Sequence, residues 1–70
     1  MEEIPIGQAI ALARHRKHWT QQRLAVVLGV SKSTVANWER GQHFPLRNLG
    51  AVEEALEISL ARYLPAQAAS

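Results

Sequence analysis

The sequence predicts an all-α fold of five short helices in a single domain. Apolar residues recur at the three- and four-residue spacing of a helical face, and no segment shows the alternation of a β-strand. Thr20 and Ser31 each precede such a run and belong to the residue types that favour helix N-caps. Gly29 lies between two runs, where a left-handed backbone conformation allows a sharp turn. These observations predict consecutive helices joined by tight turns.

The helices are expected over residues 5–17, 21–28, 32–40, 46–56 and 59–64. Pro5 suits the first turn of a helix, because its φ is fixed near the helical value. Gly41 ends the third helix, and Pro45 excludes helix through the loop that follows. We therefore assign residues 1–64 to the folded domain and 65–70 to a disordered C-terminal tail.

The first four predicted helices each have a candidate buried face. The inward positions are Ile6, Ile10, Ala13, Leu24, Ala25, Leu28, Val35, Trp38, Leu49, Val52 and Leu56. Trp19 is expected to fill the gap between the first two helices. A 70-residue chain supports only a small core, so each of these positions matters for stability.

Composition excludes several classes of protein. The chain has no cysteine, which excludes a disulfide framework and thiolate chemistry. No apolar run is long enough to cross a membrane and no signal peptide is recognisable, so we expect a cytoplasmic protein. There is no aspartate and no nucleophile–base pair, so we expect no enzyme and no cofactor. His15, His18 and His43 do not complete a metal site, because no cysteine joins them and His43 is distant in sequence.

Basic residues gather in the middle of the chain. Seven lie between Arg14 and Arg47 against one acid, Glu39, and the other five acids lie outside this window. The window coincides with the two helices joined at Gly29. Two short helices joined in this way are typical of a helix-turn-helix, whose second helix enters the major groove of DNA. Basic charge over such a unit indicates phosphate contact, and a solvated basic face is the alternative.

An ordered set of motifs carries a family resemblance. It consists of Arg14, TQQRLA at 20–25, LGVS at 28–31, TVANWERG at 34–41, Pro45 and ALEISLARYL at 55–64. Together they resemble the lambda-repressor/Cro-like (Xre-type) helix-turn-helix family over residues 6–64. The chain departs from the family at His18 and Glu57, where glycine is frequent. The resemblance implies a five-helix lambda-repressor-like DNA-binding domain with the helix-turn-helix at the second and third helices.

The resemblance also implies which residues read base edges in double-stranded DNA. They are Lys32, Ser33, Thr34 and Asn37. Lysine can donate to guanine O6 and N7, asparagine can pair bidentately with adenine, and serine can donate or accept. Thr34 could contact a thymine methyl group or a phosphate. The alternative is that Lys32 and Asn37 only solvate an exposed helix.

A second set of residues is expected to bind phosphate, which positions the protein without specifying sequence. The set is Gln21, Gln22, Arg40, Gln42, His43, Arg47 and Asn48. Gln21 opens the second helix, where free N–H groups and the helix dipole favour an anion. For each arginine of the set, an idle solvent-exposed role is the alternative.

Arg14 and Glu39 are expected to have a structural role. The resemblance implies an ion pair between these two positions that links the first helix to the third. Trp38 follows Val35 by three residues on the inward face, so we interpret it as core, and stacking on a nucleobase is the alternative.

A homodimer follows from the same resemblance. Its interface candidates are Leu60, Tyr63 and Leu64, for which burial in the core is the alternative. The expected function is a sequence-specific transcriptional regulator of bacterial or phage type, a small repressor on a palindromic operator. The alternative is a protein-interaction module on the same fold, such as an antitoxin or adaptor that acts through a protein partner.

Overall fold

Residues 4–63, the part of the chain that the computed structural model describes, contain four α-helices and no strand. The helices are α1 (Ile6–Arg16), α2 (Gln21–Leu28), α3 (Lys32–Glu39) and α4 (Leu49–Leu56), followed by a 3-10 turn, η1 (Ala61–Tyr63). The prediction of an all-α fold is confirmed. The prediction of a fifth α-helix over 59–64 is not, because its described part forms only one 3-10 turn. Leu64 and the tail predicted over 65–70 lie outside the described residues.

The start of α4 differs from its predicted position. It begins at Leu49 instead of Leu46, because the preceding residues form tight turns. The Leu46 N–H donates to the Phe44 carbonyl at 2.8 Å, and the Asn48 N–H donates to the Pro45 carbonyl at 3.1 Å. These bonds leave the backbone around Pro45 turned away from the helical path.

Local side-chain chemistry sets the boundaries of α2 and α3. The Thr20 hydroxyl accepts a hydrogen bond from the Arg23 N–H at 3.0 Å, and the Ser31 hydroxyl accepts one from the Thr34 N–H at 3.1 Å. Each cap satisfies a backbone donor that has no partner within its own helix. Gly29 closes α2 with a left-handed φ of 73°. The N-caps and the turn glycine are therefore those that the sequence predicts.

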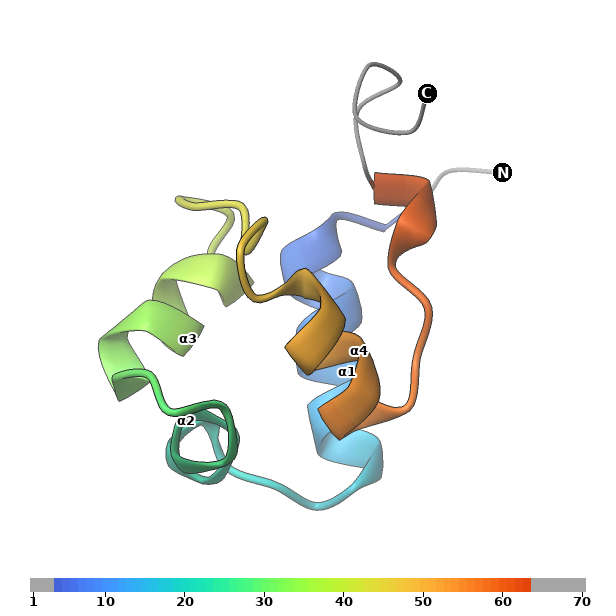
Figure 1. Ribbon diagram of the computed structural model, residues 1–70. Helices are drawn as coiled ribbons and strands as arrows, with labels where there is room; N and C mark the ends of the chain where they lie inside the picture. The colour runs from blue at the N-terminus through green and yellow to red at the C-terminus, as the bar shows by residue number, and fades with distance from the viewer. Residues whose placement is uncertain (1–3, 64–70) are drawn as a thin grey trace.

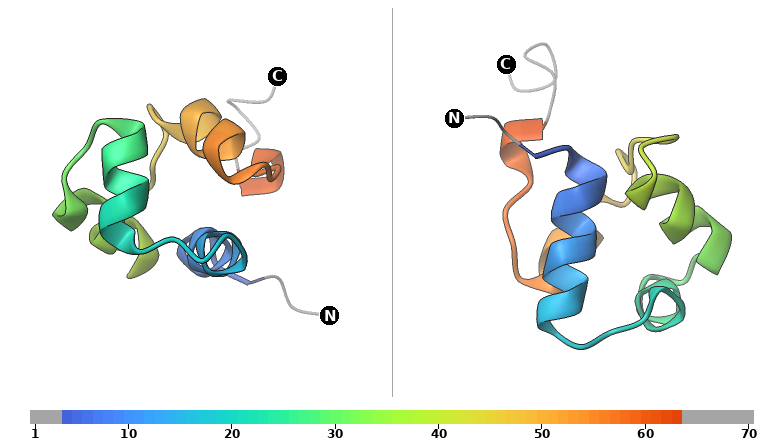
Figure 2. Two further views of the ribbon diagram at one scale, coloured as in Figure 1. Left: turned by 90° about the horizontal axis from the view of Figure 1, so that it is seen from below. Right: turned by 180° about the vertical axis from the view of Figure 1, so that it is seen from behind.

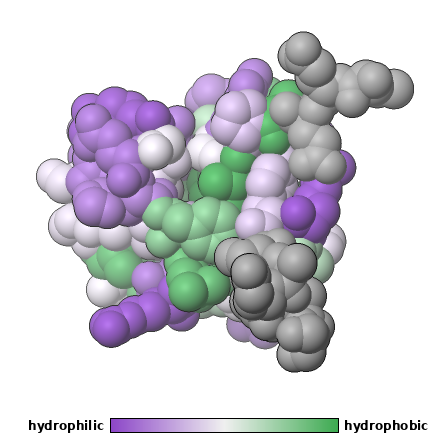
Figure 3. All heavy atoms as spheres, turned by 90° about the horizontal axis from the view of Figure 1, so that it is seen from above, coloured by the Kyte–Doolittle hydropathy of each residue, from purple (hydrophilic) through white to green (hydrophobic). Residues whose placement is uncertain are grey.

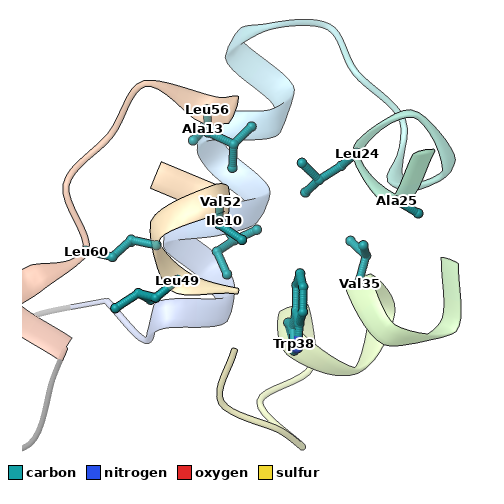
Figure 4. Packing of buried hydrophobic residues seen from close by; sticks show 10 residues of the cluster. All are labelled: Ile10, Ala13, Leu24, Ala25, Val35, Trp38, Leu49, Val52, Leu56 and Leu60. Atoms are coloured by element: carbon teal, nitrogen blue, oxygen red, sulfur yellow. The ribbon is translucent and has the colours of Figure 1, made fainter. Parts of the chain in front are cut away.

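The core lies where the four helices meet (Figure 4). Its buried members are Ile10, Ala13, Leu24, Ala25, Val35, Trp38, Leu49, Val52, Leu56 and Leu60. Trp19 packs against this cluster from the corner between α1 and α2 and is half-buried. Trp38 is buried among these side chains, which leaves its ring unavailable for stacking on a base.

The helices form two pairs. α1 lies beside α4, with α2 and α3 on one side of this pair and residues 57–63 on the other (Figures 1 and 2). α2 and α3 pack closely together, and α3 also packs on α1. Helix α3 consequently lies at an edge of the molecule, with one face on the core and the other uncovered. No helix within residues 4–63 is long and apolar enough to cross a membrane.

Gly7 allows the closest approach between helices α1 and α3. A Cβ atom at Gly7 would lie 2.3 Å from the Trp38 carbonyl oxygen and 2.7 Å from the Glu39 carbonyl oxygen. Both oxygens belong to the last turn of α3, so only a residue without a side chain fits here. This role of Gly7 was not predicted, because a glycine inside a helical run does not indicate which helix crosses it.

Candidate nucleic-acid interface

Helix α3 has a buried face and an uncovered face. Val35 and Trp38 face the core, while Lys32 and Ser33 are exposed in the first turn. Thr34 and Asn37 are half-buried beside them. The structure thus brings the four predicted base-reading residues to the side of α3 that the core leaves uncovered.

Two of these four side chains already have partners. The Thr34 and Ser31 hydroxyls lie 2.9 Å apart, so the Thr34 hydroxyl takes part in the cap of α3. The Arg40 guanidinium donates from Nη2 to Asn37 Oδ1 at 2.6 Å. Sequence reasoning did not predict this second bond. The i, i+3 spacing permits it, but a chain position does not determine which way a surface side chain turns.

The N-terminus of α2 offers free backbone donors. No hydrogen-bond partner within residues 4–63 faces the N–H groups of Gln21 and Gln22. Such groups and the positive end of the helix dipole attract an anion. Gln22 is exposed, whereas Gln21 is half-buried and its Nε2 donates to Glu39 Oε1 at 3.0 Å. The Gln21 side chain is therefore held by α3.

The segment between α3 and α4 carries all five of the other predicted phosphate-binding residues. Four of them, Arg40, Gln42, His43 and Arg47, are exposed. Asn48 is half-buried at the N-cap position of α4, where its side chain makes no capping bond.

The same loop contains two exposed apolar side chains that the sequence analysis did not single out. Phe44 is 41% exposed and Leu46 is 57% exposed. Seen from above, apolar side chains gather in the middle of the face and hydrophilic ones on the side of α3 (Figure 3). Pro45, which lies between Phe44 and Leu46 in the sequence, is buried and anchors the loop, whereas its two neighbours are exposed to solvent.

Arg14 and Glu39 form a buried ion pair behind this surface. Arg14 Nε donates to Glu39 Oε2 at 2.8 Å and Arg14 Nη2 donates to Glu39 Oε1 at 3.1 Å. Arg14 Nη1 also donates to the Trp19 carbonyl at 2.7 Å, and the residue is only 7% exposed. A bidentate pair of this kind is both strong and specific in geometry. It connects α1 to α3 and fixes the position of α3 relative to α1.

The basic residues divide into two groups. Arg14 and Lys17 are paired with acids, the second through a 2.6 Å contact between Lys17 Nζ and Glu57 Oε2. The Lys17 ammonium lowers the pKa of Glu57 below its ordinary value, first through this hydrogen bond and then through its charge. The remaining five basic residues of the central window are exposed: Arg16, Arg23, Lys32, Arg40 and Arg47. Most of the basic charge of the window is therefore open to solvent.

A comparison with known protein families agrees with this arrangement of helices. A family model described as Helix-turn-helix, of the lambda-repressor/Xre-like type, matches residues 10–63, more than half of the chain. The chain belongs to this helix-turn-helix family. It is a DNA-binding family whose members are typically not enzymes. No curated protein and no solved structure matches the chain.

In this helix-turn-helix protein, two of the residues predicted for a dimer interface, Leu60 and Tyr63, differ in their burial. Leu60 is 1% exposed and belongs to the core, so the interface assigned to it is wrong and the alternative holds. Tyr63 is half-buried, and its hydroxyl donates to the Ile4 carbonyl at 2.7 Å. Leu64 lies outside the described residues. Leu60 is buried because residues 57–63 run alongside the α1–α4 pair, which brings its side chain into the cluster with Ile10, Leu49 and Val52 (Figure 4).

The described part of this helix-turn-helix protein contains no candidate metal site. Residues 4–63 hold no group of three or more His, Cys, Asp or Glu side chains able to bind a metal ion.

Proposed function

We propose that this helix-turn-helix protein is a sequence-specific transcriptional regulator that binds double-stranded DNA. It acts as a small repressor, and two copies bind a palindromic operator through the major groove. The observation that carries the proposal is the uncovered face of α3, which holds Lys32, Ser33 and Asn37 while Val35 and Trp38 anchor the helix from behind.

The reading step follows from the chemistry of that face. The recognition helix of a helix-turn-helix lies in the major groove with its N-terminal residues at the base edges. Lys32 donates to guanine O6 or N7, and Ser33 donates or accepts at the neighbouring base. Thr34 uses its methyl group on a thymine methyl, since its hydroxyl is bonded to Ser31. Asn37 reads one turn further along the helix.

Phosphate contacts fix the register of the protein on the duplex. The free N–H groups of Gln21 and Gln22 receive one phosphate at the N-terminus of α2. The exposed loop side chains Arg40, Gln42, His43 and Arg47 receive others, and Asn48 offers its amide at the start of α4. Because Gln21 donates to Glu39, the first contact is coupled in position to the reading helix.

Dimerisation places two reading helices on one side of the duplex. Half-sites one helical turn apart require a separation of about 34 Å between the two helices. Of the interface candidates, Tyr63 and Leu64 remain for the contact between copies, since Leu60 is already buried within its own chain. A dimer on such an operator represses by occupying the site that polymerase needs.

Selection of bound duplexes from a random pool, followed by sequencing, tests the proposal. We expect an enriched palindrome with half-sites about one helical turn apart. Affinity for it should fall with salt by about 0.9 in log affinity per phosphate neutralised, for each unit of log salt. If the pool yields no enriched sequence, the protein-interaction module replaces the regulator, and the search turns to a protein partner.

Two single variants separate reading from positioning. Lys32→Ala should relax the preference at one base pair, because it removes a contact to a base edge. Arg47→Ala should weaken binding to all duplexes alike and lower the salt slope by about 1. The reverse pattern would contradict the division into base-reading and phosphate-binding residues.

A further inference from the structure

We propose that Arg40 is a positioning residue for Asn37 and thereby sets which base Asn37 prefers. Arg40 holds the Asn37 carbonyl, so that the NH₂ end of the amide is the end presented to DNA. This inference rests on the proposed function and deepens it, since it assigns a base preference within the operator.

The contact itself determines the orientation of the Asn37 amide. Arg40 Nη2 lies 2.6 Å from Asn37 Oδ1, a short hydrogen bond to a charged donor. A guanidinium has donors only, so its partner must be the amide oxygen and cannot be the amide nitrogen. The two ends of the Asn37 amide are therefore distinguished, and its NH₂ group is directed away from Arg40.

The surroundings allow this bond to persist. Asn37 is half-buried on α3, and Arg40 is the C-cap residue of the same helix, three positions later. Within residues 4–63, no other side chain bonds to the Asn37 amide. The other N–H groups of Arg40 stay free for a phosphate, because the exposed guanidinium uses one donor on Asn37. A single arginine thus connects a backbone contact to a base contact.

The orientation changes what Asn37 recognises. An asparagine that reads adenine uses both ends of its amide, accepting from N6–H and donating to N7. The Asn37 oxygen keeps a second lone pair, but the cationic guanidinium beside it repels an approaching N6–H₂ donor, so Asn37 acts chiefly as a donor. Guanine presents two adjacent acceptors, N7 and O6, in the major groove. We therefore expect guanine at the position that Asn37 reads, although an unheld asparagine favours adenine.

Duplex selection with five forms of the full chain tests this assignment. They are the unaltered protein, Arg40→Met, Asn37→Ala and the double variant, with Arg47→Met as a matched loss of one exposed arginine from the same loop. The position that Asn37 reads is the one whose preference Asn37→Ala abolishes. There the unaltered protein should select guanine, and Arg40→Met should shift the guanine-to-adenine ratio toward adenine by at least about fivefold. The double variant should show the same base preferences as Asn37→Ala, because Arg40 acts on those preferences only through Asn37.

Two results would overturn the inference without touching the proposed function. In the first, the unaltered protein enriches a motif with adenine at the Asn37 position. In the second, Arg40→Met lowers affinity for all duplexes and leaves every preference unchanged, as expected of Arg47→Met. If the unaltered protein enriches no motif, the proposed function fails, and this inference fails with it. Thermal unfolding of each variant checks that a changed preference belongs to a folded protein.

Discussion

Arg14 of α1 and Glu39 of α3 are joined by two hydrogen bonds, at 2.8 and 3.1 Å, although they lie 25 positions apart in the sequence. Both side chains are largely shielded from water, with 9% of each exposed. The Trp19 carbonyl and the Gln21 amide complete the hydrogen bonding around the pair. No buried polar side-chain atom within residues 4–63 lacks a partner. The pair is thus a fully satisfied polar connection between two helices.

Loss of either partner should destabilise the fold strongly. Arg14→Met leaves the Glu39 carboxylate buried without its cation, and Glu39→Leu leaves the guanidinium in the same position. Each should lower the free energy of unfolding by about 3–5 kcal/mol, measured by urea denaturation. The double variant Arg14→Met/Glu39→Leu should lose much less, because it strands no charge. Equal losses in the single and double variants would contradict this account.

Gly7 and Gly50 should respond oppositely to alanine. At Gly7 a Cβ atom would collide with the Trp38 and Glu39 carbonyls, so Gly7→Ala should destabilise by about 1–3 kcal/mol. At Gly50, in α4, a Cβ atom meets nothing within 4 Å, so Gly50→Ala should stabilise by about 0.5–1 kcal/mol. Urea denaturation of the two variants compares them. A stabilising Gly7→Ala would show that α1 and α3 can separate at no cost.

His18 occupies a left-handed conformation that favours glycine. Its φ is 61°, which costs a residue with a side chain about 1–2 kcal/mol. His18→Gly should therefore raise the free energy of unfolding by up to about 1 kcal/mol, after the greater freedom of glycine in the unfolded chain is subtracted.

The matching control is Gly29→Ala, at a φ of 73° and in open space, which should lower stability by about 1–2 kcal/mol. Thermal unfolding measures both variants. If His18→Gly lowers the midpoint, a contact of the imidazole outweighs its backbone strain.

The Lys17–Glu57 pair should make a pH-dependent contribution to stability. Its hydrogen bond and charge lower the pKa of Glu57 in the folded protein below the ordinary 4.5. The contribution is therefore complete above about pH 4.5 and is lost as the pH falls through the lowered pKa. Glu57→Gln should unfold more easily than the unaltered protein at pH 7, and the difference should vanish in strong acid.

Salt provides an independent check on this pair. Glu57 is exposed, so added salt at pH 7 should narrow the difference between Glu57→Gln and the unaltered protein. In the pH series, a stability difference between Glu57→Gln and the unaltered protein that stays constant from pH 7 to strong acid would assign the effect to something other than the ion pair.

The helix-turn-helix was predictable because its signals are local. Thr20, Ser31 and Gly29 act on backbone groups within three or four residues of themselves, so the bounds of α2 and the first residue of α3 follow from the chain. The same holds for the buried face of α3, which follows from the spacing of Val35 and Trp38.

The remaining features depend on contacts between distant parts of the chain. The sequence does not indicate that the end of α3 crosses α1 at Gly7. Nor does it distinguish Leu60 from Tyr63 as a buried residue, because the burial of Leu60 depends on residues 57–63 lying beside α1. The late start of α4 results from two turns around Pro45, which a helical spacing from Leu46 onward does not indicate. The Arg40–Asn37 bond depends on the rotamers of two surface side chains, which spacing allows without selecting.

Among the carboxylates of residues 4–63, Glu39 alone joins three segments: its own helix α3, α1 through Arg14, and the start of α2 through Gln21. The distance between the amides at the start of α2 and the uncovered face of α3 is consequently set when the protein folds. In the proposed complex, the protein would therefore hold one phosphate and the bases beside it at a fixed separation. Ordering a flexible side chain on binding costs about 0.5–1.5 kcal/mol, and Gln21 has already been ordered in the free protein. A duplex whose groove departs from this spacing would be rejected by its shape, even where its bases are correct.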